Sequence, residues 1–144
     1  MNGNSFIAWL LRSPLHGLLS SNTLLITVTG RKTGRPITTP VNYVRDGDRL
    51  WIISNRDRTW WRNLAGGAPV TVRVRGRDLR GVAEALLEPE VVAARLPAYL
   101  RGMPMAARAL GVRPAPGQAD AWQPEDVARA AATRVLIEIR LQSA

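Results

Sequence analysis

Residues 23–54 read TLLITVTGRKTGRPITTPVNYVRDGDRLWIIS, and this stretch decides the fold. Its apolar and polar side chains follow a period of two, which is typical of β-strands. The pattern predicts three strands, at residues 23–29, 37–45 and 50–54. Asp46-Gly47 is typical of a hairpin turn, so we expect the second and third strands to pair. Pro40 lies inside the second strand and predicts an edge position or a bulge there.

The period of two returns further along the chain. Residues 70–74 alternate, turn around Gly76 and return through residues 79–87, which predicts a second hairpin. Residues 135–141 alternate cleanly and predict a last strand. Six strands are therefore expected in all.

Helices are expected between and before the strands. Residues 88–133 are rich in Ala and predict helices at 89–101 and 125–132, with a Gly- and Pro-rich loop near 111–118. A short helix is expected to begin near Thr59 and to end at Gly66-Gly67. Two further short helices are expected near the N-terminus, with caps at Asn4 or Ser5 and at Ser13-Pro14.

These elements predict a single α+β domain over residues 1–144. Its centre is a six-stranded antiparallel barrel, with short N-terminal helices and a helical insertion before the last strand. The apolar run 6–19 is interrupted by Arg12 and Pro14, so we do not expect it to span a bilayer. We expect this run either to pack over one end of the core or to lie on a membrane surface. The N-terminus lacks the basic residues that begin a secretory signal, so we expect a cytoplasmic protein.

Positive charge is concentrated in the middle of the chain. The net charge is +9, and residues 30–80 alone hold 12 Lys and Arg against four Asp. The rest of the chain holds eight basic residues against seven acidic ones. Such a field favours an anionic small ligand, nucleic acid or lipid headgroups as a partner.

Lys32 is the one lysine beside nineteen arginines, and it lies in the turn GRKTG between Gly30 and Gly34. Glycines let backbone N–H groups approach a ligand, and adjacent cations bind phosphate or carboxylate. The segment therefore reads either as an anion-binding turn or as a solvated basic hairpin turn. The residues alone leave both readings open.

Several kinds of chemistry are disfavoured by composition. The chain has no cysteine, so thiol catalysis and thiolate metal sites are excluded, and with His16 as its one histidine we predict no metal site. Its tryptophans cluster instead of being interleaved along a groove, so we expect no nucleic-acid partner.

The motifs in their order resemble the deazaflavin-dependent nitroreductase family. The resemblance rests on a strand followed by GRKTG, then T-T-P-V-x-Y-V-x-D-G-D, then S-N, W-W-R-N-L and the A-P-V-T-V strand. It covers roughly residues 20–87 and, more loosely, the last strand. It implies the split-barrel fold of FMN-binding type and, as cofactor, the deazaflavin coenzyme F-420.

The resemblance also implies cofactor-binding residues. The turn should hold the phosphate, the strand after it should line the ring, and Arg58, with Arg56 and Arg62, should reach the glutamate tail. The implied cofactor-binding residues are Gly30, Arg31, Lys32, Thr33, Gly34, Thr39, Pro40, Val41, Asn42, Ser54, Asn55, Arg58, Trp60, Trp61 and Asn63.

Some of these residues have structural alternatives. Adjacent tryptophans on a helix point about 100° apart, so at least one of Trp60 and Trp61 is open to an ordinary core role. Thr39 and Asn42 lie on opposite sides of their strand, which argues against both touching one ring face. Asn63 and Ser54 can equally be hydrogen-bonding groups at the ends of their elements.

The implied activity is transfer of a hydride from the reduced coenzyme to a small conjugated acceptor, such as a quinone or nitroaromatic. No catalytic side chain is assigned, because hydride transfer needs no acid–base pair from the protein. The segment before the last strand carries fewer tyrosines than the nitroreductases do, so the acceptor pocket differs; Tyr99 and Trp9 are its candidates.

Two other functions stay open. One is an FMN-binding split-barrel reductase, although the long anionic tail of F-420 suits the basic segment better. The other is a non-catalytic protein that binds a cofactor or lipid. Split barrels commonly pair through their sheets, so the resemblance leaves a homodimer open.

Overall fold

The computed structural model describes residues 22–117 and 121–142. The predicted N-terminal helices, their contact with a membrane surface and Trp9 fall outside the described residues. None of the described helices is long and apolar enough to cross a bilayer.

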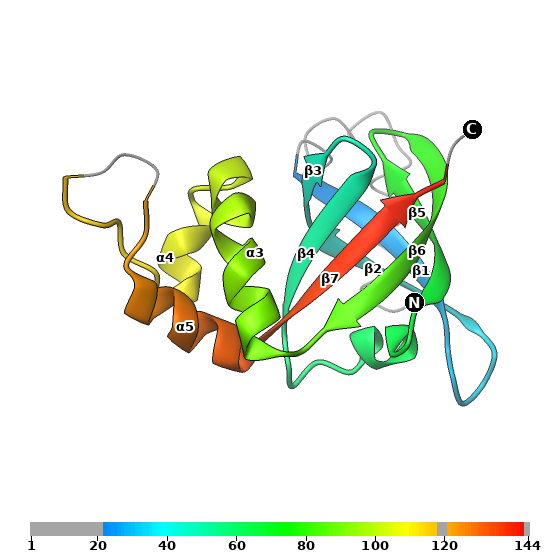
Figure 1. The fold of residues 1–144 in the computed structure, drawn as a ribbon. Helices are drawn as coiled ribbons and strands as arrows, with labels where there is room; N and C mark the ends of the chain where they lie inside the picture. The colour runs from blue at the N-terminus through cyan, green and yellow to red at the C-terminus, as the bar shows by residue number, and fades with distance from the viewer. Residues whose placement is uncertain (1–21, 118–120, 143–144) are drawn as a thin grey trace.

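The described residues form a curled, wholly antiparallel sheet with helices on one side (Figure 1). Its strand order is β2-β1-β5-β6-β7-β4-β3. The strands are β1 Thr23–Thr29, β2 Pro36–Asn42, β3 Val44–Asp46, β4 Arg49–Asn55, β5 Ala68–Val74, β6 Arg77–Leu86 and β7 Arg134–Leu141. The prediction of a curled antiparallel sheet with a helical insertion before the last strand is confirmed, and the sheet forms a half-barrel.

The prediction of six strands is wrong, because the segment 37–45 forms two strands. β2 pairs with β1, whereas β3 pairs with β4. These pairings put β2 and β3 at opposite ends of the sheet order, and the chain changes partner at Tyr43. The chain can pass from one edge strand to the other at a single residue because the curl of the sheet brings its two edges together. Pro40 lies in the edge strand β2, as predicted.

Both predicted hairpins form, and their turns explain the registers. Asp46 pairs with Arg49, and Gly47 between them has φ 62°, which favours glycine. In the second hairpin Arg75 and Gly76 have φ 51° and 79°. Positive φ at both central residues is typical of a type I′ turn, whose twist matches that of the flanking strands.

The barrel interior is filled by the inward side chains of these strands. Leu24, Ile52, Val72 and Ile137 are all at most 1 % exposed. β6 and β7 approach closely where Gly81 pairs with Leu141. A Cβ on Gly81 would lie 2.7 Å from the carbonyl oxygen of Arg140, so this position excludes a side chain.

The helical insertion covers the outer face of β4 and β7 (Figure 1). It consists of α3 Pro89–Gly102, α4 Ala106–Leu110 and α5 Pro124–Thr133, of which α4 was not predicted. β4 is apolar on both faces: Leu50 and Ile52 point into the barrel, and Trp51 and Ile53 pack against the helices. The helices are thereby fixed beside the end of β4, where the candidate site lies.

A buried carboxylate ties the loop before α5 to that helix. The side chain of Asp126 is fully buried, and its Oδ2 accepts hydrogen bonds from the backbone N–H (3.1 Å) and the Nε (2.9 Å) of Arg113. Arg129 donates to Oδ1 at 3.1 Å. These bonds from Arg113 hold the pKa of Asp126 down at about 2, against a usual 3.8.

The depressed pKa predicts acid-sensitive stability. Because the folded-state pKa is the lower one, Asp126 stabilises the fold fully above the usual value of 3.8, and this stabilisation is lost as pH falls towards about 2. Thermal unfolding should show Asp126→Asn melting below wild type at pH 6, with the gap narrowing as the pH approaches 2.5. Glu125→Gln, on an exposed neighbour, is the control; an unchanged gap for Asp126→Asn across this range would contradict the prediction.

Candidate functional site

Two depressions lie on either side of the short 3-10 helix η1, Trp60–Leu64. One, here called the cleft, has a volume of about 370 Å³ and lies between the end of the barrel and helices α3 and α4. Its lining residues are Thr23, Pro40, Val41, Asn42, Ile53, Ser54, Asn55, Arg58, Trp60, Tyr99, Ala106, Ala109, Leu110 and Arg134. The other, here called the basic pocket, has a volume of about 790 Å³ and is lined by Gly30, Arg31, Lys32, Thr33, Ile37, Thr59, Arg62 and Asn63.

The turn between β1 and β2 forms one side of the basic pocket. The Gly30 N–H donates to the Arg35 carbonyl (2.8 Å), and the Gly34 N–H donates to the Gly30 carbonyl (2.9 Å). Gly34 has φ 70°, which favours glycine. A Cβ on Gly30 would lie 3.1 Å from the Thr33 hydroxyl and 3.2 Å from the Arg35 carbonyl oxygen, so a side chain there fits only if the turn shifts slightly.

Side chains of η1 hold the turn in place. The Arg31 N–H donates to Asn63 Oδ1 (2.9 Å), and its guanidinium donates to the Arg62 carbonyl (3.0 Å). Asn63 Nδ2 in turn donates to the Trp60 carbonyl at 2.9 Å. Both polar groups of the Asn63 side chain are thus engaged within the protein, and Arg31 is partly a structural residue.

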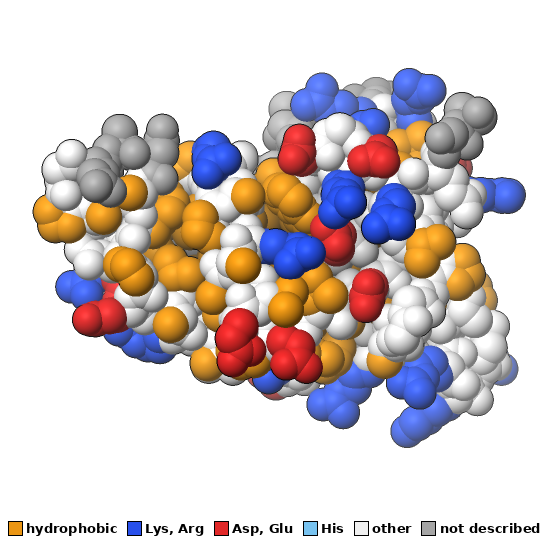
Figure 2. Space-filling model, in the orientation of Figure 1, with side chains coloured by type: hydrophobic (Ala, Val, Ile, Leu, Met, Phe, Trp, Pro, Cys, Tyr) orange, Lys and Arg blue, Asp and Glu red, His pale blue; other side chains and the backbone are white. Residues whose placement is uncertain are grey.

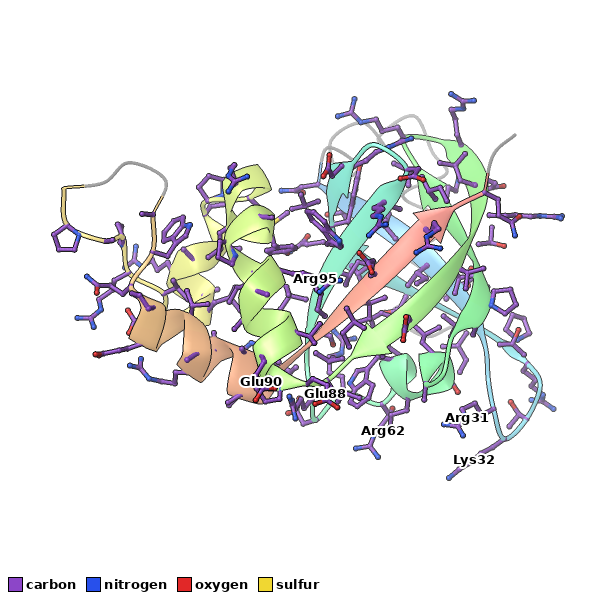
Figure 3. All side chains as sticks on the ribbon, viewed as in Figure 1. Arg31, Lys32, Arg62, Glu88, Glu90 and Arg95 are labelled. Atoms are coloured by element: carbon purple, nitrogen blue, oxygen red, sulfur yellow. The ribbon has the colours of Figure 1, made fainter. Side chains whose placement is uncertain are left out.

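Arg31, Lys32 and Arg62 are the exposed cations among the described lining residues of the basic pocket, and the guanidinium of Arg31 is engaged by the Arg62 carbonyl. Figure 3 shows all three at the same end of the barrel, and Figure 2 shows Lys and Arg side chains gathered there. The Arg62 guanidinium lies 5.4 Å from the centre of the Trp61 ring, a cation–π contact between neighbouring residues of η1. The pocket can therefore bind a phosphate or carboxylate group.

The walls of the cleft combine apolar side chains with a comparable share of polar and cationic groups. Arg58 and Arg134 are its cationic residues, and no carboxylate is among the described lining residues. Tyr99 is 3 % exposed, and its hydroxyl donates to the sulfur of Met103 at 3.6 Å. Burial raises the pKa of Tyr99, so its phenol stays protonated at neutral pH.

The two adjacent tryptophans have different environments. Trp61 packs in the barrel core, and its Nε1 donates to the Asn55 carbonyl at 3.2 Å. Trp60 also borders the cleft, and its buried Nε1 finds no acceptor among the described residues. An unpaired buried donor costs about 1–3 kcal/mol, so this N–H is a destabilising feature that the described residues leave uncompensated.

The structure divides the predicted site residues between the two depressions. The cleft receives Pro40, Val41, Asn42, Ser54, Asn55, Arg58, Trp60 and Tyr99, and the basic pocket receives Gly30, Arg31, Lys32, Thr33 and Asn63. Gly34 completes the turn beside the basic pocket. Trp61 lies in the core, and so does Thr39, which pairs with Ile26 and is 4 % exposed.

Two arginines differ from expectation. Arg56 donates to the carbonyls of Arg134 (3.0 Å), Leu87 (2.6 Å) and Ala131 (3.5 Å), so it fastens the loop after β4 and is not available for a tail. Arg134 lines the cleft but was missed, as were Ala106, Ala109 and Leu110 of the α4 segment. No sequence motif marks these residues; Arg134 directly precedes the last strand predicted at 135–141.

The sequence model of the F420H(2)-dependent quinone reductase family matches residues 14–106, more than half of the chain. The chain belongs to this family. The match contains the turn, β4, η1 and the whole of α3, and it confirms the predicted relation to deazaflavin-dependent proteins.

Individual curated relatives match about half of the chain. The chain is 35 % identical to the F420H(2)-dependent quinone reductase of Mycobacterium tuberculosis strain H37Rv over 72 residues. The match covers 46 % of this chain and 48 % of the relative. The chain therefore spans about half the length of the curated relatives it matches.

Solved structures show the same fold at low identity. The FAD and haem binding protein of Mycobacterium smegmatis superposes with a TM-score of 0.54 at 18 % identity, over 91 % of this chain and 67 % of that one. A structure described as a domain-swapped dimer gives 0.57 at 17 % identity, over 94 % of both chains. At these identities the likeness shows the fold alone.

Proposed function

We propose that the protein is an oxidoreductase that transfers a hydride from reduced coenzyme F-420 to a small conjugated acceptor, with quinones as the first class to test. The observation that carries the proposal is the placement of η1. It joins a cleft with an unpaired buried N–H, on Trp60, to a pocket with the exposed cations Lys32 and Arg62. A ligand with an apolar ring and an anionic tail matches this pair of depressions, and family membership supports the same cofactor.

The residues have distinct parts in this proposal. Lys32, Arg62 and the N–H groups of the turn would bind the phosphate in the basic pocket. Trp60, Val41 and Ser54 would border the ring in the cleft. When bound, the coenzyme supplies the hydride, and the protein orients the acceptor and excludes water.

FMN is the competing cofactor, and the structure favours F-420 over it. The basic pocket gathers three cations, Arg31, Lys32 and Arg62, which suits a phosphate that continues into a carboxylate tail. FMN has a single phosphate and no such tail. A cytoplasmic location and a homodimer stay predictions that cell fractionation and sedimentation would test.

Titration of the purified protein with oxidised F-420 and, separately, with FMN tests the proposal. Because Trp60 borders the cleft, micromolar F-420 should quench tryptophan fluorescence, and FMN should need a higher concentration. Free tryptophan corrects for absorption by the ligands. Tight FMN binding without a response to F-420 would contradict the cofactor.

Turnover distinguishes an enzyme from a carrier. Menadione added to the protein with reduced F-420 should restore the absorbance of the oxidised coenzyme faster than menadione without protein. Binding without such acceleration by any quinone or nitroaromatic would support a non-catalytic cofactor-binding protein instead.

A further inference from the structure

The cleft has a second group of lining residues that the implied cofactor site does not use. They are Ala106, Ala109 and Leu110 around α4, Tyr99 of α3 and Arg134 at the start of β7. The three aliphatic side chains offer an apolar surface to a flat ring. Arg134 is the cation of this group, and it is the residue whose chemistry the proposed function leaves unexplained.

Arg134 is held firmly at its backbone. Its carbonyl accepts the Nε of Arg56 at 3.0 Å, and the same guanidinium binds the Leu87 carbonyl at 2.6 Å. Arg56 thereby joins the loop after β4 to the ends of β6 and α5. The start of β7, and with it Arg134, is fixed relative to the cleft.

The charge of Arg134 has no carboxylate partner among the described residues. Its side chain is half-buried, and Nη1 donates to the Thr133 hydroxyl at 3.0 Å. The nearby buried carboxylate, Asp126, is engaged by Arg113 and Arg129, and Glu138 is engaged by arginines elsewhere. A half-buried guanidinium without a counter-charge, on the wall of a cleft, indicates an anionic ligand atom.

We propose that Arg134 binds the acceptor oxygen that becomes negatively charged when the hydride arrives, and so selects quinone-type acceptors. This inference rests on the proposed function. The hydride carries two electrons and one proton to the quinone and leaves the hydroquinone monoanion. The coenzyme, oxidised by losing the hydride, releases its remaining proton to solvent, and solvent protonates the monoanion, so two electrons and two protons pass from coenzyme to quinone. The guanidinium donates to the oxyanion more strongly than to the neutral carbonyl, which lowers the barrier.

Binding of two naphthoquinones tests the inference without turnover. At pH 7.5, 2-hydroxy-1,4-naphthoquinone is an anion that mimics the charged product, and menadione is neutral. Calorimetric titration of the protein, with and without saturating oxidised F-420, should show the anion binding about 10-fold more tightly, as expected for one charged hydrogen bond. Arg134→Gln should abolish the preference, and Arg134→Lys should retain part of it.

Arg140→Gln is the matched control, because Arg140 lies on the same strand, is exposed and does not line the cleft. It removes the same charge and should keep the preference for the anion. Thermal unfolding of each variant checks that the fold is intact. If Arg134→Gln kept the preference, or if Arg140→Gln lost it equally, the assignment would be overturned.

Kinetics give a second, separate readout. With menadione, Arg134→Gln should lower kcat by about 10²-fold, the usual effect of losing an oxyanion donor, with little change in KM or in F-420 affinity. A rise in KM with kcat unchanged would contradict transition-state binding by Arg134. Absence of F-420 binding in wild type would instead refute the proposed function, whereas the anion preference would still be measurable in the free protein.

Discussion

Replacement of Lys32 by alanine should weaken F-420 binding by roughly 10- to 100-fold and leave thermal stability unchanged. The Lys32 side chain is exposed in the basic pocket, and within the described residues it makes no hydrogen bond or ion pair. Its removal therefore costs the fold nothing, but it takes one charged contact from a bound phosphate. Fluorescence titration with oxidised F-420, beside a thermal melt, measures both quantities.

Two other variants separate a local contact from general electrostatics. Arg35→Ala removes an exposed cation next to the turn but outside the basic pocket, and it should change the affinity by less than about 3-fold. Arg31→Ala should lower both affinity and melting temperature, because Arg31 donates to the Arg62 carbonyl. Equal weakening by Lys32→Ala and Arg35→Ala would show that only the overall field matters.

Substitutions of the two tryptophans should have opposite consequences. Trp61→Ala should lower the free energy of unfolding by about 3–5 kcal/mol, because it empties part of the barrel core and removes the hydrogen bond to the Asn55 carbonyl. Trp60→Phe keeps most of the packing and removes a buried donor that has no described acceptor. Its free energy of unfolding should therefore stay within about 1 kcal/mol of wild type.

For F-420 affinity we expect the opposite: substitution of Trp60 should matter more than substitution of Trp61. Trp60→Phe should lower F-420 affinity about 10-fold, the effect of one lost hydrogen bond to the ring system. Trp61→Phe is the matched variant: it should lose some stability through the Asn55 contact and bind F-420 nearly normally. Chemical denaturation and fluorescence titration measure the two effects, and full affinity in Trp60→Phe would remove Trp60 Nε1 from the site.

Local sequence was sufficient for most strands and helices. Short-range signals set these elements: the alternation at residues 70–74, the turn glycines at 47 and 76, and the prolines that begin α3 and α5. Each signal determines the conformation of only a few neighbouring residues. The segment at 37–45 shows the limit of such reasoning. Its alternation is continuous, yet the structure divides it at Tyr43. β2 pairs with β1 at one edge of the curled sheet, and β3 pairs with β4 at the other edge.

The candidate site was predictable in composition and only partly in arrangement. The ordered motifs brought out Lys32, Ser54 and Trp60, all of which lie at one depression or the other. The motifs did not show which of Trp60 and Trp61 borders the cleft. That difference depends on what packs against each face of η1. Asn63 was predicted as a ligand contact, and the structure shows its amide engaged with Arg31 and Trp60.

The sequence by itself determined most of the strands and helices, the basic turn around Lys32 and the relation to deazaflavin-dependent proteins. These follow from short-range periodicity, turn chemistry and motif order. Only the tertiary structure decided that η1 divides the site in two, that Arg56 is a fastening residue and that Arg134 faces the cleft. The bond from Arg56 to the Ala131 carbonyl spans 75 residues of chain, and a contact over that distance arises from packing and leaves no local pattern.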